Sequence, residues 1–183
     1  DGDGDLDYIE STWDNQTEKI WKNDGSGSFS DFGETTGEHY GSSGAIGDVD
    51  GDGDIDYFEN NTSGDPEQLW INDGNGSFTD SGNSFGTLGY IWTEMVDVDA
   101  DGDLDMVSAI GSTTDVLWLN DGAGGFTDSG RSIGSGATDF TVSFDADGDH
   151  DMDILLTDSL TESQLWLNDG AGFFSNSGQS LPA

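Results

Sequence analysis

The sequence contains no cysteine, two prolines, two histidines and only three Lys plus Arg among its 183 residues. Without cysteine, disulfide bonds cannot staple the fold. The sequence also has 39 acidic residues, so its formal net charge is −36. So acidic a surface repels phosphate, and we therefore expect neither nucleic acid nor an anionic membrane as a partner. The sequence also lacks an apolar run of membrane-spanning length, so we expect no membrane insertion.

The inventory for catalysis is equally poor. His39 and His150 are the two histidines, and no nucleophile motif such as GxSxG appears. Glu38 precedes His39 in "GEHY", but one adjacent pair without a third partner is a weak signal. Close carboxylate pairs, which would suit glycoside hydrolysis, occur mainly inside acidic loops that a metal ion would occupy. We therefore expect no enzymatic activity.

Aspartate and glycine are abundant, and they are concentrated in one repeated loop. The stretch "DVDGDGDID" at residues 48–56 has an aspartate at every second position, and it recurs as "DVDADGDLD" at 97–105 and "DADGDHDMD" at 145–153. The first seven residues, "DGDGDLD", are the same loop without its first two positions. Like charges this close repel unless something cancels them. Because Ca²⁺ takes six to eight oxygen ligands and is often held in short acidic loops, the pattern favours calcium.

A second motif follows each loop. The segments "IWKNDGSGSF", "LWINDGNGSF", "LWLNDGAGGF" and "LWLNDGAGFF" start at residues 20, 69, 117 and 165. Asn-Asp-Gly between two apolar runs is a hairpin turn signal. In the third repeat, the pattern predicts strands at 90–97, 104–110, 116–120 and 125–130.

Repeats of 45–50 residues with four strands each are typical of propeller blades. The predicted fold is all-β, a β-propeller or propeller-like array of four-stranded antiparallel blades. The predicted blades are residues 1–37 (without a first strand), 38–86, 87–134 and 135–183.

The combination "DxDGDGDxD … LWxNDGxGxF" resembles the VCBS/FG-GAP repeats of integrin-type β-propellers. The resemblance implies one calcium site in the hairpin between the first two strands of each blade, hence three to four Ca²⁺ ions. It implies side-chain ligands at loop positions 1, 3, 5 and 9, and a backbone carbonyl ligand at position 7. The residues at these positions are Asp1, Asp3, Asp5 and Asp7 in the first loop; Asp48, Asp50, Asp52, Asp54 and Asp56 in the second; Asp97, Asp99, Asp101, Asp103 and Asp105 in the third; and Asp145, Asp147, Asp149, Asp151 and Asp153 in the fourth.

Two departures from the pattern bear on these sites. The sixth loop position is Gly4, Gly53 and Gly102 but His150 in the fourth loop. The turn should need a positive φ there, which histidine tolerates less well, so we expect weaker calcium binding in that loop. The first blade also lacks a strand. We therefore expect either a longer chain, of which this is a mature form or a piece, or a strand donated by another chain.

Other readings of the same residues remain. EF-hands and dockerins would need helices after the loop, RTX rolls would need tandem nonapeptides, and thrombospondin-type repeats would need cysteine. A solvated acidic turn without metal is the simplest alternative. The four repeated tryptophans fit packing between blades, and the aromatics outside the repeat are better candidates for a ligand surface: Trp13, Trp92, Tyr40 and Tyr90. Four asparagines match the N-glycosylation pattern: Asn15, Asn60, Asn61 and Asn75.

The functional hypothesis is a calcium-stabilised repeat protein, extracellular or at the cell surface, that serves adhesion or recognition of a glycan or a protein. Two alternatives stay open. The chain is the structural protomer of an extracellular filament or surface assembly, in which neighbouring chains complete the first blade. Or it is an ancillary propeller domain of a secreted polysaccharide-degrading enzyme.

Overall fold

The computed structural model describes residues 1–11, 16–33, 38–39, 41–61, 64–87, 89–111, 113–134, 136, 138–158, 162–179 and 181. The chain divides into two compact units, Asp1–Gly89 and Tyr90–Ala183. Each unit is described by itself below.

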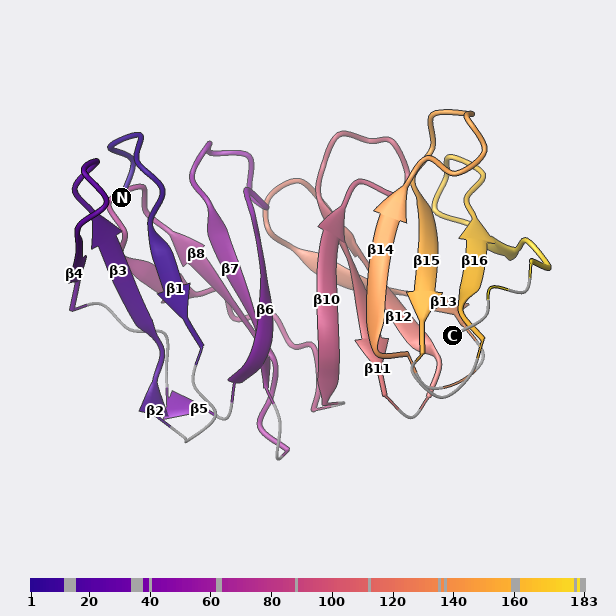
Figure 1. The fold of residues 1–183 in the computed structure, drawn as a ribbon, viewed down its shortest axis with the longest axis horizontal. Coiled ribbons are helices and arrows are strands. Elements are labelled where there is room, and N and C mark those ends of the chain that lie inside the picture. The colour runs from indigo at the N-terminus through magenta and orange to yellow at the C-terminus, as the bar shows by residue number, and fades with distance from the viewer. Residues whose placement is uncertain are drawn as a thin grey trace. The chain divides into compact units, whose positions relative to one another are not determined.

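The first unit contains two sheets of the blade type (Figure 1). The first has three strands in the order β1-β3-β4, namely β1 (Tyr8–Glu10), β3 (Lys19–Asn23) and β4 (Phe29–Asp31). The second has the order β6-β7-β8-β9, namely β6 (Gly41–Gly47), β7 (Asp56–Asn61), β8 (Gln68–Asn72) and β9 (Phe78–Asp80). A short pair, β2 (Gln16–Thr17) with β5 (Glu38–His39), accompanies them.

The second unit repeats the four-stranded plan twice. Its first sheet has the order β10-β11-β12-β13, with β10 (Tyr90–Val96), β11 (Asp105–Ile110), β12 (Asp115–Asn120) and β13 (Phe126–Ile133). Its second sheet has the order β14-β15-β16-β17, with β14 (Phe140–Phe144), β15 (Asp153–Thr157), β16 (Gln164–Leu167) and β17 (Ser175–Asn176). Neighbouring strands are antiparallel throughout both sheets.

These sheets confirm the predicted all-β fold of antiparallel blade-like sheets. The described residues contain no helix, and hence none long and apolar enough to cross a membrane. In the third repeat the four strands lie where the sequence predicts them, except that β13 continues to Ile133. The short pair of β2 with β5 was not predicted, and it joins residues 38–39 to the repeat before them. The blade boundaries themselves remain predictions.

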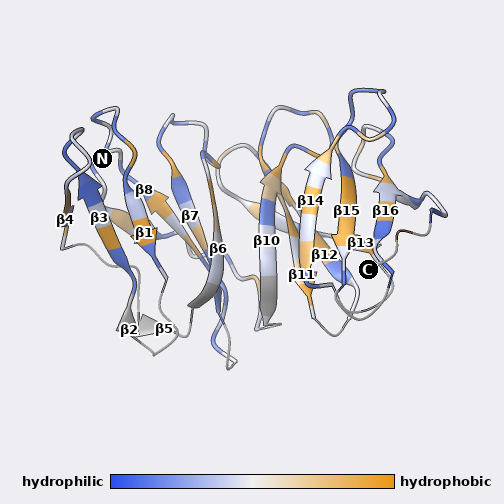
Figure 2. Cartoon of the chain, in the orientation of Figure 1, coloured by the Kyte–Doolittle hydropathy of each residue, from blue (hydrophilic) through white to orange (hydrophobic). Residues whose placement is uncertain are grey.

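The cores are built from strands that are buried on both faces. Every residue of β7 and of β11 is buried. In the second unit, the first sheet and its acidic loop contribute Val96, Val98, Val107, Leu117 and Ile133 to a cluster that Ile154 and Leu156 of the second sheet complete. In Figure 2, β15 is largely hydrophobic, whereas the acidic loop before it is hydrophilic. In the first unit, the rings of Phe58 and Phe85 meet edge to face at 5.0 Å.

Candidate metal centre

The acidic loops join the first two strands of each four-stranded sheet. They connect β6 to β7, β10 to β11 and β14 to β15, and the shortened first loop leads into β1. Within a unit, the acidic loops lie at the same end of its sheets (Figure 1). This is the hairpin position that the family resemblance implies.

The ninth aspartate anchors each loop to its sheet. In the second loop, Asp56 Oδ2 accepts the Val49 N–H at 2.9 Å and Oδ1 accepts the Asn72 N–H at 2.9 Å. Asp105 and Asp153 accept the equivalent pairs of N–H groups, at 2.8 to 3.0 Å. The asparagine belongs to the Asn-Asp-Gly turn, so this carboxylate ties both repeated motifs together. Burial raises the pKa of Asp105 to about 6, although the two N–H groups act in the opposite direction.

In three of the loops, three carboxylates gather closely enough to hold one metal ion. Within each group the carboxylate oxygens lie within 4.8 Å of one another. The groups are Asp48, Asp50 and Asp56; Asp97, Asp99 and Asp101; and Asp145, Asp147 and Asp153. The other predicted ligands of these loops lie outside the groups, and their roles remain predictions.

The third loop offers carboxylate oxygen atoms without a hydrogen-bond partner in the part of the chain that the structure describes. Oδ1 of Asp97 and Oδ1 of Asp99 are buried and accept no hydrogen bond from the described residues. In the second and fourth loops, the N–H of the fourth residue binds the first aspartate instead, from Gly51 to Asp48 at 2.8 Å and from Gly148 to Asp145 at 2.7 Å.

Burial, and after it the neighbouring charge of Asp101, raise the pKa of Asp99. Buried unpartnered carboxylate oxygens are costly unless a cation binds them. The residues of the third loop therefore fit a hard metal ion.

The seventh aspartate turns its side chain toward the Asn-Asp-Gly turn. A Cβ added at Gly74 would overlap the carboxylate of Asp54, which would then have to move. The same overlap occurs between Gly122 and Asp103, and it recurs in the first and fourth repeats. This orientation agrees with the backbone role that the resemblance implies for the seventh position.

The first loop is arranged differently. The α-ammonium group of Asp1 donates to Asp7 Oδ2 at 2.7 Å, and Lys22 forms ion pairs with Asp1 and Asp3. No three-carboxylate group forms in this loop among the described residues. The ligand roles of Asp1, Asp3, Asp5 and Asp7 stay predictions.

The backbone of the loops confirms the expected positive φ at the sixth position. His150 has a φ of 79°, where the three glycines of the other loops have 95° to 99°. Ala100, at the fourth position of the third loop, is a second non-glycine residue with positive φ, at 59°. The sequence carried a signal for it, because the other three loops have glycine there. The side chain of His150 is 94% exposed, and its Nδ1 lies 3.5 Å from Asp145 Oδ2.

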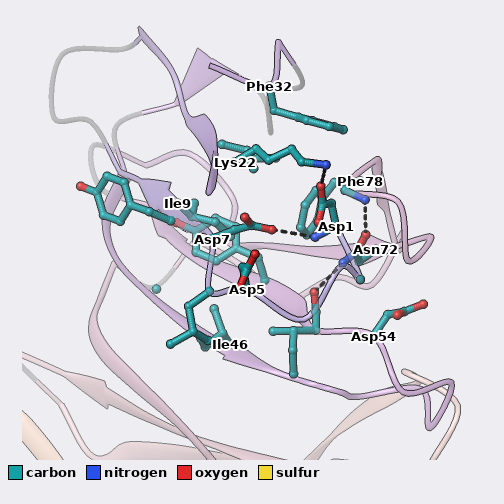
Figure 3. A pocket seen from close by; sticks show the side chains of 18 of the residues that line it. Asp1, Asp5, Asp7, Ile9, Lys22, Phe32, Ile46, Asp54, Asn72 and Phe78 are labelled. Atoms are coloured by element: carbon teal, nitrogen blue, oxygen red, sulfur yellow. Dashed lines mark hydrogen bonds and ion pairs between the residues drawn. The ribbon is translucent and has the colours of Figure 1, made fainter. Parts of the chain in front are cut away.

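A pocket of about 650 Å³ lies in the first unit (Figure 3). Ile9 of β1 and Ile46 of β6 line it, together with Phe78. Lys22 and Asp1 face each other across an ion pair within it. Among the described residues β1 pairs with β3 alone, so its second edge borders this pocket.

A set of buried acids was missed from the sequence. Each stands three residues before a repeated tryptophan, namely Glu18 before Trp21, Glu67 before Trp70 and Asp115 before Trp118. All three are at most 1% exposed. Asp115 accepts the Ile110 N–H and the Thr138 hydroxyl at 2.9 and 2.8 Å, and Glu67 accepts the Gly89 N–H at 3.0 Å. Their constant distance from the tryptophan was the signal that could have found them.

The remaining candidates have mixed outcomes. Trp118 is buried and the other repeated tryptophans are half-buried. Trp92 meets Phe140 edge to face at 5.3 Å. The side chains of Asn60 and Asn61 are fully buried, so in the folded chain they are closed to a glycosyltransferase. Trp13, Tyr40 and Asn15 lie outside the described residues, as do the side chains of Tyr90, Glu38 and His39.

The fold and these loops define a class of all-β repeat proteins in which each sheet carries one acidic hairpin. The model of the FG-GAP-like repeat family matches the chain three times, at residues 1–59, 48–108 and 97–156. The chain therefore belongs to the FG-GAP-like repeat family. No curated protein sequence matches it.

Proposed function

We propose that the chain is an extracellular, calcium-stabilised repeat module that recognises a glycan or a protein and catalyses no reaction. The observation that carries the calcium proposal is the third loop. There, two buried carboxylate oxygens that accept no hydrogen bond from the described residues share a group with Asp101. Oxygen donors of this kind suit hard cations such as Ca²⁺.

Three ions are proposed for the second, third and fourth loops, with the three gathered aspartates of each loop as side-chain ligands. A bound Ca²⁺ would neutralise the repelling carboxylates of its loop. The protein contributes the buried ninth aspartate, which fixes the loop against the Asn-Asp-Gly turn. A fourth ion in the first loop would require Asp1 to exchange its ion pair with Lys22.

The extracellular part of the proposal follows from calcium supply and composition. Free calcium reaches millimolar levels outside cells, where sites of modest affinity are filled. Loops on a rigid sheet scaffold often carry recognition. The acidic surface favours partners that are neutral or basic over nucleic acid.

Calorimetric titration with Ca²⁺ and, separately, Mg²⁺ tests the metal sites. The double variant Asp97→Asn and Asp99→Asn should bind one ion fewer than the wild type. Asp128→Asn is the matched control, because Asp128 is an exposed acid of β13 outside any loop. Equal stoichiometry in the double variant and the control would contradict the assignment of the third loop. The recognition function is tested on a glycan panel and on extracellular-matrix proteins, with Ca²⁺ and with EDTA. Absence of calcium-dependent binding to every probe would argue against it.

The pocket beside β1 supports a second candidate function, which is assembly with neighbouring chains. The strands that follow the other three acidic loops each pair on both edges, whereas β1 pairs on one within the described residues. An extended segment with the pattern of β6 could add to β1, because an open sheet edge offers unpaired N–H and C=O groups. A peptide with the sequence GSSGAIGDVD, titrated against the chain, tests this candidate. Binding that Ile9→Lys does not weaken would place the peptide elsewhere.

A further inference from the structure

Two glutamates meet inside the first unit, away from the acidic loops. Glu59 lies on β7, and Glu18 lies between β2 and β3. Both are fully buried, and their carboxyl groups form a hydrogen bond with each other. Glu59 Oε2 also accepts the Trp70 Nε1–H at 3.1 Å. Oε1 of Glu59 accepts no hydrogen bond from an N–H group or a hydroxyl group of the described residues.

Two ionised carboxylates cannot form such a hydrogen bond, because each is an acceptor only. The contact needs either a proton or a cation between them. The lysine and arginine side chains are engaged elsewhere, since Lys19 pairs with Asp31, Lys22 pairs with the first acidic loop, and Arg131 donates to backbone carbonyls in the second unit. Calcium would need six to eight oxygen ligands, which two fully buried carboxyl groups do not supply. A proton remains.

We propose that Glu18 and Glu59 share one proton, and that the protonated pair is a pH-sensitive link between the first and second sheets of the first unit. The pair lies on the same face of β7 as Tyr57, whose hydroxyl contacts the Ser11 hydroxyl at 2.8 Å. That face of β7 therefore contacts the residues flanking β1 and β3 at two places. Loss of the proton would leave two buried charges in contact at one of them.

Among the other ionisable groups that the structure describes around the pair, Asp65 acts in the same direction. Asp65, between β7 and β8, adds negative charge, and Tyr57 is a neutral phenol. The neighbouring strands β6 and β8 contain no ionisable residue. Glu67, the residue before β8, accepts the Gly89 N–H. Burial first, and the charge of Glu18 second, raise the pKa of Glu59 to about 7.

The direction of the pH effect follows from the difference between the pKa of Glu59 in the folded chain and the pKa of an exposed glutamate. The folded chain keeps the shared proton up to about pH 7, whereas an exposed glutamate releases its proton near pH 4.5. The stabilisation is therefore complete below pH 4.5 and is lost as the pH rises to 7. Within that window the folding equilibrium constant should fall by up to about tenfold per pH unit. Above pH 7 this pair adds no further dependence.

Urea unfolding of the full chain between pH 5 and pH 8, in saturating calcium, tests the proposal. Glu59→Gln keeps a hydrogen bond to Glu18 but cannot ionise. The ratio of the folding equilibrium constants of this variant and the wild type should increase with pH up to 7. Glu10→Gln is the matched control, because Glu10 accepts the Trp21 Nε1–H at 2.9 Å on a partly exposed strand. The control should follow the wild type. If Glu59→Gln also follows the wild type, the proposal is wrong.

A measurement on the wild-type chain keeps the proposal testable if Glu59→Gln does not fold. The carboxyl carbons of ¹³C-labelled glutamate can be titrated by NMR, and Glu59 can be assigned through its contact with the Trp70 indole N–H. A titration midpoint well above that of exposed glutamates is expected. A midpoint in the ordinary range would overturn the proposal. Neither readout uses calcium affinity, so failure here is distinguishable from failure of the proposed metal sites.

Discussion

Calcium removal should destabilise the second unit more than the first. The second unit contains two loops with gathered carboxylates, and the first unit contains one. An ion that binds only the folded state at a hundred times its Kd stabilises that state by about 2.7 kcal/mol. The first unit should therefore lose about 3 kcal/mol and the second about 5 kcal/mol. For units of this size, 1 kcal/mol corresponds to a Tm shift of about 4–8 °C.

Scanning calorimetry in Ca²⁺ and in EDTA measures the total shift, which should exceed 10 °C. Hydrogen exchange followed by mass spectrometry separates the two units. Peptides from β10–β11 and β14–β15 should lose more protection in EDTA than peptides from β6–β7. The double variant Asp97→Asn and Asp99→Asn should remove about half of the effect in the second unit. An unchanged Tm in EDTA would refute the reasoning, because it would mean that the clustered carboxylates tolerate one another without a cation.

Two further predictions concern single side chains. His150→Gly should remove the strain of a non-glycine residue at a φ of 79° and stabilise the folded chain by about 1 kcal/mol. It should also strengthen calcium binding in the fourth loop, which calorimetric titration would detect. No change in either quantity would mean that the loop carries no strain at this residue. Phe58→Ala should cost about 3–5 kcal/mol in urea unfolding, because Phe58 is fully buried against Phe85. The control Phe29→Ala, at a ring 49% exposed, should cost far less, and equal losses would contradict the assigned core.

The strands and the loop positions were predictable because they depend on local pattern. Turn residues such as the Asn-Asp-Gly set and short runs such as Val116–Leu119 define strand ends without reference to distant parts of the chain. The positive φ at the sixth loop position was predictable for the same reason, since three loops place glycine there. The roles of the individual aspartates were less accessible. Asp54 and Asp56 look alike in the sequence, yet one faces the turn and the other is buried under two backbone N–H groups.

The buried glutamates show why the rest was out of reach. An acid at a fixed distance before the tryptophan is visible once the repeats are aligned. Its burial, and the meeting of Glu18 with Glu59, depend on how two sheets of one unit pack. A sequence reading places charged residues on the surface by default, because isolated buried charges are rare. Only the folded structure brings the two carboxyl groups together, so that a shared proton could offset the cost of burying them.

The two groups of acids give the chain opposite responses to pH. In the loops, protons compete with calcium. Burial raises the pKa of Asp99, and it raises the pKa of Asp105 to about 6, so metal binding should weaken as the pH falls toward 6. At the glutamate pair, stability is lost as the pH rises from 4.5 to 7. In saturating calcium the stability should therefore pass through a maximum, and a tenfold lower calcium concentration should move that maximum to higher pH. Urea midpoints measured across pH 4 to pH 9 at two calcium concentrations test this. If the pH of maximum stability does not change with calcium concentration, loop protonation does not compete with metal binding, and the argument is wrong.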